Sequence, residues 1–288
     1  MTAPKALTGL SEIADAYDVL LCDVWGVIHN GRQAFPAACA ALQRFAADRG
    51  PVVLISNAPR PSAHVHEQLA MLGVPRDAWS AFVSSGDATR ALLAERAPGP
   101  AWAIGPDRDW PLYEGLDLAF AGPEDAAFIS CTGPVDDERE TPEDYRDRLA
   151  LCARRGLEMI CANPDRVVQR GDRLVYCGGA LADLYAALDG PVLMAGKPYA
   201  PIYDLAIAEA ETLLGRPAQR ARILCVGDGV PTDVRGAMDQ KLDCLFIAGG
   251  IHGHEAVDAA GRIDPVRAAA LLAREGGAAR FGLGALAW

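Results

Sequence analysis

Basic residues are scarce in this sequence of 288 residues, and long apolar runs are missing. It carries 27 Lys and Arg against 38 Asp and Glu, which gives a net charge of −11. Such a chain repels the nucleic-acid backbone and anionic lipid, so we expect no nucleic-acid partner and no membrane partner. No uninterrupted apolar run approaches the roughly 18 residues of a membrane span, and residues 1–18 lack the apolar segment of a signal peptide. We therefore expect a soluble cytoplasmic protein.

Cysteine pairs of the kind found in zinc sites and disulfide frameworks are also missing. The eight Cys residues lie far apart, and none belongs to a C-x-x-C pair. Most stand inside apolar segments such as LLCDV and ILCVG. We interpret them as reduced residues of the core rather than as disulfides or zinc ligands.

Short apolar runs alternate with helix-patterned stretches along almost the whole chain. The runs are too short to be helices, and we predict strands at 18–22, 52–56, 101–104, 126–130, 157–162, 192–195, 223–226 and 244–247. Between them, prolines such as Pro36 and Pro265 open helical stretches. This alternation predicts βα units and a mostly parallel sheet, so the fold class is α/β. Hydrophobic residues make up 51% of the chain, which is enough for two packed units.

Four of the predicted strands end in residues that carry chemistry. In chain order these residues are Asp23, then Ser56 and Asn57, then Lys197, and last Asp228 and Asp233. Ligands of open parallel sheets bind at the carboxyl ends of the strands. We therefore expect the four ends to belong to one sheet and to converge on a single crevice.

The side chains at these ends suit a divalent cation bound beside a phosphate. Magnesium prefers oxygen ligands and usually keeps water plus one or two carboxylates, which Asp23 and Asp228 can provide. The cation lets an anionic carboxylate approach an anionic phosphate. Ser56 and nearby backbone N–H groups can hydrogen-bond phosphate oxygens, and Lys197 can neutralise charge that moves in the transition state.

Taken in this order, the four segments resemble the four signature motifs of the haloacid dehalogenase superfamily, and the resemblance spans nearly the whole chain. The chain is most similar to the class IIA branch, which includes NagD-like and nitrophenylphosphatase-like sugar and nucleotide phosphatases. The marks of this branch are DVWGVIHNG (23–31), ISNAPR (55–60), ANPDR (162–166), GGAL (178–181) and GKP (196–198). The resemblance implies a Rossmann-like, doubly wound parallel sheet with an inserted α/β cap of the C2 type.

The resemblance also implies an activity, which is the magnesium-dependent hydrolysis of a small phosphomonoester such as a sugar phosphate or a nucleotide. Asp23 is then the nucleophile that takes the phosphoryl group as an aspartyl-phosphate. Ser56 and Lys197 complete the catalytic set and bind the phosphoryl group, with Asn57 beside them as a substrate-binding residue. The expected partner is a small phosphorylated metabolite.

The same resemblance implies a Mg²⁺ site and its ligands. Asp23 and Asp228 bind the ion, and Asp233 orders the water molecules of the metal or orients Lys197. The backbone carbonyl two residues after the nucleophile is also a ligand in this family, and here Trp25 supplies it.

The spacing of the motifs locates an inserted domain. Ser56 and Lys197 are 141 residues apart, whereas the flanking motif pairs are 33 and 31 residues apart, each about one βαβ unit. The excess of roughly 100 residues is enough for a small domain. We predict a core at residues 1–80 and 189–288 and a cap at residues 81–188.

The cap of a class IIA enzyme is expected to close over the site and exclude water. Substrate choice then lies in its loops, where Asn163, Asp165 and Arg166 are candidates for substrate binding. An Asn-Pro-Asp turn without any ligand explains the same residues. A homodimer stays open, because caps of this class often mediate dimers.

The chain departs from the family pattern at Trp25. Phosphatases of this superfamily normally have a second Asp there, which protonates the leaving oxygen and then activates water. General acid–base catalysis is typically worth about 10²- to 10⁴-fold, or about 3 to 5 kcal/mol of barrier. Three interpretations stay open.

The first interpretation is an active hydrolase that uses an activated phosphate or another proton donor such as His29. The second is a catalytically weak or inactive regulatory protein that binds a phosphorylated metabolite. The third is a different transfer reaction through Asp23, either phosphotransfer or carbon–halogen hydrolysis.

Overall fold

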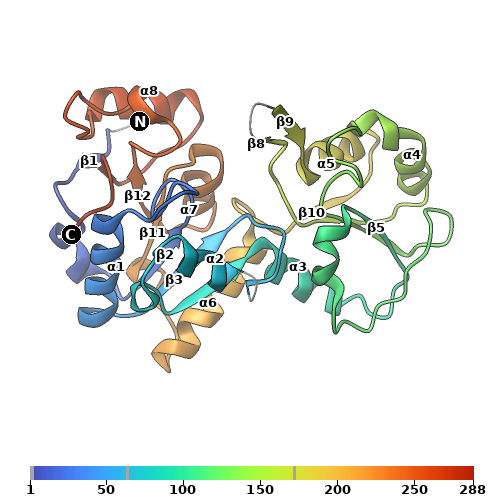
Figure 1. The fold of residues 1–288 in the computed structure, drawn as a ribbon, viewed down its shortest axis with the longest axis horizontal. Coiled ribbons are helices and arrows are strands. Elements are labelled where there is room, and N and C mark those ends of the chain that lie inside the picture. The colour runs from blue at the N-terminus through green and yellow to red at the C-terminus, as the bar shows by residue number, and fades with distance from the viewer. Residues whose placement is uncertain (1–2, 63–64, 171–172) are drawn as a thin grey trace. The chain divides into compact units, whose positions relative to one another are not determined.

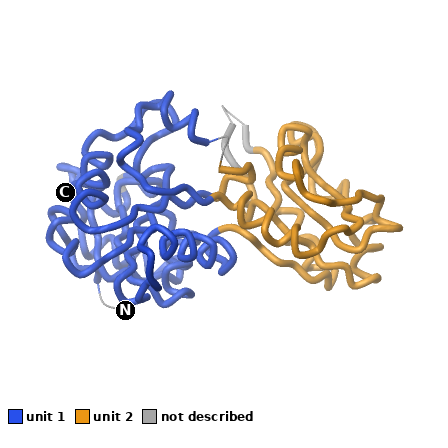
Figure 2. Tube along the Cα trace, turned by 90° about the horizontal axis from the view of Figure 1, so that it is seen from below, with its two compact units in different colours: residues 1–56, 64–83, 197–288 blue, residues 57–63, 84–196 orange. Residues whose placement is uncertain are grey.

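The chain divides into two compact units. The computed structural model describes residues 3–62, 65–170 and 173–288. The first unit comprises residues 1–56, 64–83 and 197–288, and the second comprises residues 57–63 and 84–196 (Figure 2). Each unit has a parallel sheet and a hydrophobic core of its own.

A seven-stranded sheet forms the first unit (Figure 1). Its strands in spatial order are β1 (Lys5–Ala6), β13 (Phe281–Leu283), β12 (Asp243–Ile247), β11 (Ile223–Gly227), β2 (Val19–Asp23), β3 (Val52–Ser56) and β4 (Ala81–Ser84). The pairings from β1 through to β3 are all parallel. Strands β2, β3 and β11 are buried at every residue, as expected for central parallel strands that are covered on both faces.

The helices of the first unit connect these strands. They are α1 (Pro36–Asp48), α2 (Val65–Met71), α6 (Ala200–Leu214), α7 (Arg235–Asp239) and α8 (Pro265–Arg274). Helix α1 begins with Pro36, which needs no hydrogen-bond acceptor at the first helical position. Its Leu42 and Phe45 belong to the same buried cluster as Leu20 of β2 and Leu54 of β3, so the helix and the sheet share one core.

A four-stranded parallel sheet forms the second unit. Its spatial order is β10 (Val192–Met194), β7 (Met159–Cys161), β6 (Phe128–Cys131) and β5 (Ala101–Ile104). The helices are α3 (Ser85–Ala94), α4 (Arg146–Arg154) and α5 (Gly178–Ala187), and an antiparallel hairpin joins β8 (Val167–Arg170) to β9 (Arg173–Tyr176). The predicted α/β class with a second, smaller parallel sheet is therefore confirmed.

One prediction about the sheet is wrong. The strand before Lys197 was expected to lie in the same sheet as the other three motif strands. Instead, β10 pairs with β7 of the second unit, with Val192 opposite Met159 and Met194 opposite Cys161. The strand has only three residues, all of them half-buried, so its short apolar run does not specify which of two sheets it joins.

The second unit differs from residues 81–188 at both ends, and residues 81–83 belong to the first unit. Strand β10 brings residues up to Gly196 into the second unit. Residues 57–63 also belong to it, because the N–H of Gly86 donates to the carbonyl of Ala58 and the N–H of Ser62 donates to the Asp87 carboxylate. The role of residues 81–188 as a cap stays a prediction.

All eight cysteines are buried and none of them forms a disulfide, as predicted. Within the described ranges, no helix has both the length and the apolar character needed to cross a membrane.

An ion-pair cluster fixes the start of β2. Asp18, directly before the strand, accepts hydrogen bonds from Arg222 at 2.6 Å and from Arg216 at 2.8 Å. Its own N–H donates to the carbonyl of Arg222, the residue before β11. The hydrogen bonds from Arg222 and then Arg216 lower the pKa of Asp18 to about 2. This cluster holds the two central strands side by side at their amino ends.

We expect Asp18→Asn to be less stable than the wild type at pH 7 by up to about 1 kcal/mol, since the ion pairs are partly exposed to solvent. The pKa of Asp18 in the folded state lies below its unfolded value of about 3.9. The stabilisation by the ion pairs of Asp18 is therefore complete above about pH 4 and disappears as the pH falls towards 2. Urea unfolding of both proteins at pH 7, 4, 3 and 2 measures the difference. Asp15→Asn, at a side chain that is 79% exposed, is the control. A difference that stayed constant down to pH 2 would contradict the assignment.

Candidate active site

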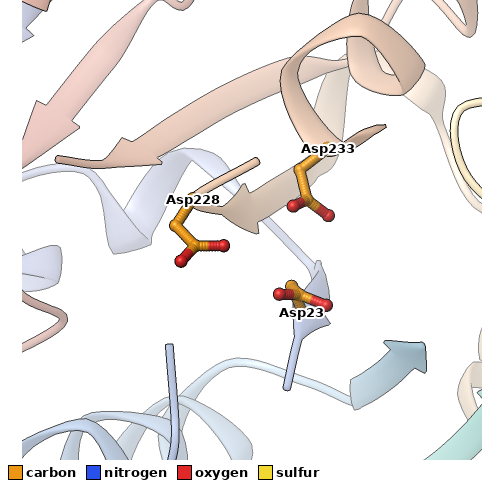
Figure 3. A group of neighbouring side chains, drawn as sticks. All are labelled: Asp23, Asp228 and Asp233. Carbon is orange, nitrogen blue, oxygen red and sulfur yellow. The ribbon is translucent and has the colours of Figure 1, made fainter. Parts of the chain in front are cut away.

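Three carboxylates meet at the carboxyl edge of the seven-stranded sheet. Asp23 ends β2, Asp228 follows β11, and Asp233 lies in the helical turn Val230–Val234 (Figure 3). Cys22 is paired with Val226, so the two strands end at the same level and Asp23 and Asp228 leave the sheet together. All three Asp side chains are buried, and each has an oxygen within 4.8 Å of the other two.

Lys197 joins two of these carboxylates. Its buried ammonium group donates one hydrogen bond to Oδ1 of Asp23 and another to Oδ1 of Asp233, the second at 2.7 Å. The other oxygen of Asp233 accepts from the N–H of Gly229 at 3.0 Å. Asp233 therefore orients Lys197, and Lys197 in turn orients Asp23.

Two glycine-containing loops surround Asp228. The N–H of Ile251 donates to its Oδ2 at 2.6 Å. A Cβ on Gly26 or on Gly250 would lie 2.0 Å from the same oxygen, and Gly26 also has a φ of +77°. Only glycine allows both loops to come this close. Ile251 was not among the site residues predicted from the sequence, although two glycines after the strand 244–247 marked a close approach at this edge of the sheet.

The buried charges at this edge do not balance, since three carboxylates face one ammonium. Burial raises the pKa of Asp23 to about 8, and the charge of Asp233 adds to the shift while Lys197 opposes it. Burial likewise raises the pKa of Asp228 to about 6, again with a contribution from Asp233. For Lys197, burial acts to lower the pKa, but the two carboxylates outweigh it and raise the pKa above its usual range.

A divalent cation would compensate the excess negative charge. The carboxylate oxygens of Asp23, Asp228 and Asp233 and the backbone carbonyl of Trp25 are all hard oxygen donors, which Mg²⁺ prefers. The residues present therefore fit the predicted ion.

Ser56 lies at the next strand end. It is the last residue of β3 and follows Ile55, which is paired with Asp23 across the two strands. The sheet thus brings the Ser56 backbone next to the nucleophile position. The side chain is buried.

The other predicted substrate-binding residues belong to the second unit. Asn57 donates to the Asp165 carboxylate at 3.5 Å, and the N–H of Asp165 donates to the Asn163 side chain at 3.0 Å. The second contact is the Asx turn expected from Asn-Pro-Asp. Arg166 pairs with Asp183 of α5. Their roles towards a substrate stay predictions.

His29 supports the loop that follows Asp23. Its ring is buried, and its Nδ1 accepts a hydrogen bond from the N–H of Gly31 at 3.1 Å. Its carbonyl accepts from the N–H of Gly26 at 2.9 Å. Burial lowers the pKa of His29 and so disfavours its protonated form, and nothing in these contacts favours it as the missing proton donor.

Comparisons with known proteins are consistent with this geometry. The family model described as haloacid dehalogenase-like hydrolase matches residues 20–119, and a second model, HAD-hydrolase-like, matches residues 194–273. A crystal structure of a haloacid dehalogenase-like hydrolase from Brucella suis 1330 is 44% identical, covers 98% of this chain and 99% of that chain, and has a TM-score of 0.80.

Two characterised relatives are more distant. The 5′-nucleotidase YutF of Bacillus subtilis is 25% identical over 243 residues, which is 83% of this chain and 90% of the relative. The ribonucleotide monophosphatase NagD of Escherichia coli K12 is 24% identical over 245 residues, with the same two coverages.

We expect Mg²⁺ to stabilise the wild-type protein by about 2.7 kcal/mol at a free concentration about 100-fold above its Kd, and Asp228→Asn to lose most of this effect. Thermal unfolding in MgCl₂ and in EDTA measures both. In EDTA the variant is expected to be no less stable than the wild type, because the amide removes a buried like charge and still accepts from Ile251. Asp239→Asn, at a surface carboxylate paired with Arg235, is the control. An unchanged Mg²⁺ effect in Asp228→Asn would exclude Asp228 as a ligand.

Proposed function

The chain belongs to the haloacid dehalogenase-like hydrolase family, in the class IIA branch of NagD-like and nitrophenylphosphatase-like enzymes, and we propose that it hydrolyses a small phosphomonoester through an aspartyl-phosphate at Asp23. The observation that carries the proposal is the buried contact of Lys197 with Asp23 and Asp233 beside Asp228. The names of the two characterised relatives, both nucleotide phosphatases, support the reaction type.

In the proposed reaction, a carboxylate oxygen of Asp23 attacks phosphorus and the bond to the leaving oxygen breaks. Water then attacks phosphorus, which releases inorganic phosphate and restores Asp23. Lys197 acts to lower the pKa of Asp23 and so favours its ionised form, and together with Ser56 it binds the oxygens of the transferred group. Asp23, Asp228 and the Trp25 carbonyl would hold Mg²⁺ with Asp233 nearby, and the ion would supply positive charge that lets two anions approach each other.

We assign substrate selection to the second unit, with residues 81–188 as the cap of a core formed by residues 1–80 and 189–288. Asn57, Asn163 and Asp165 are the proposed contacts to the rest of the substrate. A sugar phosphate and a nucleotide both fit this assignment. Eight buried cysteines that form no disulfide support a reducing compartment, so we propose that the enzyme acts in the cytoplasm.

A binding protein with negligible turnover is the second candidate, and Trp25 is the observation that favours it. An indole cannot protonate a leaving oxygen, and the buried His29 does not take over this role. The remaining metal and phosphate contacts still favour attack on phosphorus. Phosphate release with and without Mg²⁺ separates the two candidates.

We expect Asp23→Asn to reduce phosphate release by at least roughly 10³-fold, because the amide is not a nucleophile. A screen of phosphorylated metabolites and 4-nitrophenyl phosphate supplies the substrate, and mass spectrometry of acid-quenched enzyme detects the phosphoryl group on Asp23. Asp258→Asn, at a surface carboxylate paired with Arg262, is the control. Substantial activity in Asp23→Asn would exclude the nucleophile assignment. No release of phosphate from any ester by the wild type would favour the binding protein.

A further inference from the structure

Two large apolar side chains are exposed beside the predicted metal ligand Asp228. Trp25 is 54% exposed and Ile251 is 77% exposed. Trp25 precedes Gly26 and Ile251 follows Gly250, and a Cβ on either glycine would lie 2.0 Å from Oδ2 of Asp228. The two exposed side chains therefore belong to the two loops that approach the charged site.

The indole of Trp25 is held in place although half of it is exposed. It lies against the backbone of Gly31, where a Cβ would come within 2.3 Å of the ring. The buried ring of His29 contacts it edge-on, with 4.9 Å between the ring centroids. His29 is itself tied to Gly31 by a hydrogen bond of 3.1 Å. A fixed and exposed aromatic ring loses little conformational entropy when it contacts a ligand.

The lack of an acidic side chain at position 25 restricts which leaving groups can depart. Asp23 forms a bond to phosphorus while the bond from phosphorus to the ester oxygen breaks, and the electron pair stays on that oxygen. Without an acid at position 25, the oxygen departs as an anion and takes its proton from water afterwards. A phenol has a pKa of about 10, whereas an alcohol ionises about as poorly as water, whose pKa is about 15.7. A phenolate is therefore much the better leaving group.

From these two features we infer, on the basis of the proposed function, that Trp25 is a specificity-determining residue whose indole contacts the leaving group of the substrate. It selects phosphate monoesters of planar aromatic hydroxyl compounds over those of alkyl alcohols. A nucleoside 5′-monophosphate satisfies only half of this requirement, because it has a planar base but an alkyl leaving oxygen.

The test compares kcat/KM of the wild type and variants for phenyl phosphate, 4-nitrophenyl phosphate, glycerol phosphate and AMP with Mg²⁺ present. We expect the wild type to prefer phenyl phosphate over glycerol phosphate by at least roughly 10²-fold. Trp25→Ala should lower kcat/KM for phenyl phosphate by about two- to ten-fold through a higher KM, and the ratio of aryl to alkyl activity should fall with it. Trp25→Phe should retain most of the contact.

Trp25→Asp restores a proton donor, so its activity on glycerol phosphate should rise by about 10²-fold while its preference for aryl esters falls. Trp110 is the matched control, because it is an equally exposed tryptophan, 51%, whose ring contacts Tyr113 and Phe120 in the second unit. Trp110→Ala should leave the ratio of aryl to alkyl activity unchanged. Thermal unfolding of every variant confirms that it is folded.

Equal efficiency of the wild type on glycerol phosphate and phenyl phosphate overturns the inference and leaves the proposed function standing. The same holds if Trp25→Ala keeps the wild-type KM for aryl esters, or if Trp110→Ala shifts the ratio as much as Trp25→Ala does. No phosphate release from any of the four esters overturns the proposed function, and the inference with it.

Discussion

Burial of three carboxylates against a single ammonium group is the constraint on which the rest of the first unit depends. Like charges held this close in a poorly solvated site repel one another, and folding has to offset that cost. The structure does so with fixed donors, since Lys197 contacts two of the carboxylates and a backbone N–H group contacts Asp228 and another Asp233. The imbalance that remains is a predisposition to bind a cation.

The loop after β2 contains residues that shape the site in different ways. Gly26 makes room for Asp228, and the buried His29 and Gly31 support the indole of Trp25. The indole of Trp25 has no acid–base chemistry, yet its neighbours fix its position as they would fix a catalytic side chain. Such fixation is unexpected at a position that has simply lost its function.

Much of the fold follows from the sequence. Strands β2, β3, β11 and β12 were predicted within one residue at either end, because parallel strands covered on both faces are uninterrupted apolar runs. The sheet assignment of β10 was not predictable, since three half-buried residues fit either sheet. The contact between Ile251 and Asp228 joins positions 23 residues apart, and the tie between His29 and Gly31 depends on a ring nitrogen. Neither contact leaves a periodic pattern in the sequence.

Two of the crossings between the units lie beside residues of the site. The first segment of the first unit ends at Ser56 and its last segment begins at Lys197, and both side chains are buried. Boundaries between domains normally fall in exposed linkers, which recombination can cut and rejoin without harm. Here an exchange of the second unit between relatives would open the chain directly beside both proposed phosphate contacts, in addition to the junctions with residues 64–83. We therefore expect the second unit to diverge by substitutions within it rather than by exchange. Grafting the second unit of a relative onto this first unit would require the contacts of Ser56 and Lys197 to be rebuilt together.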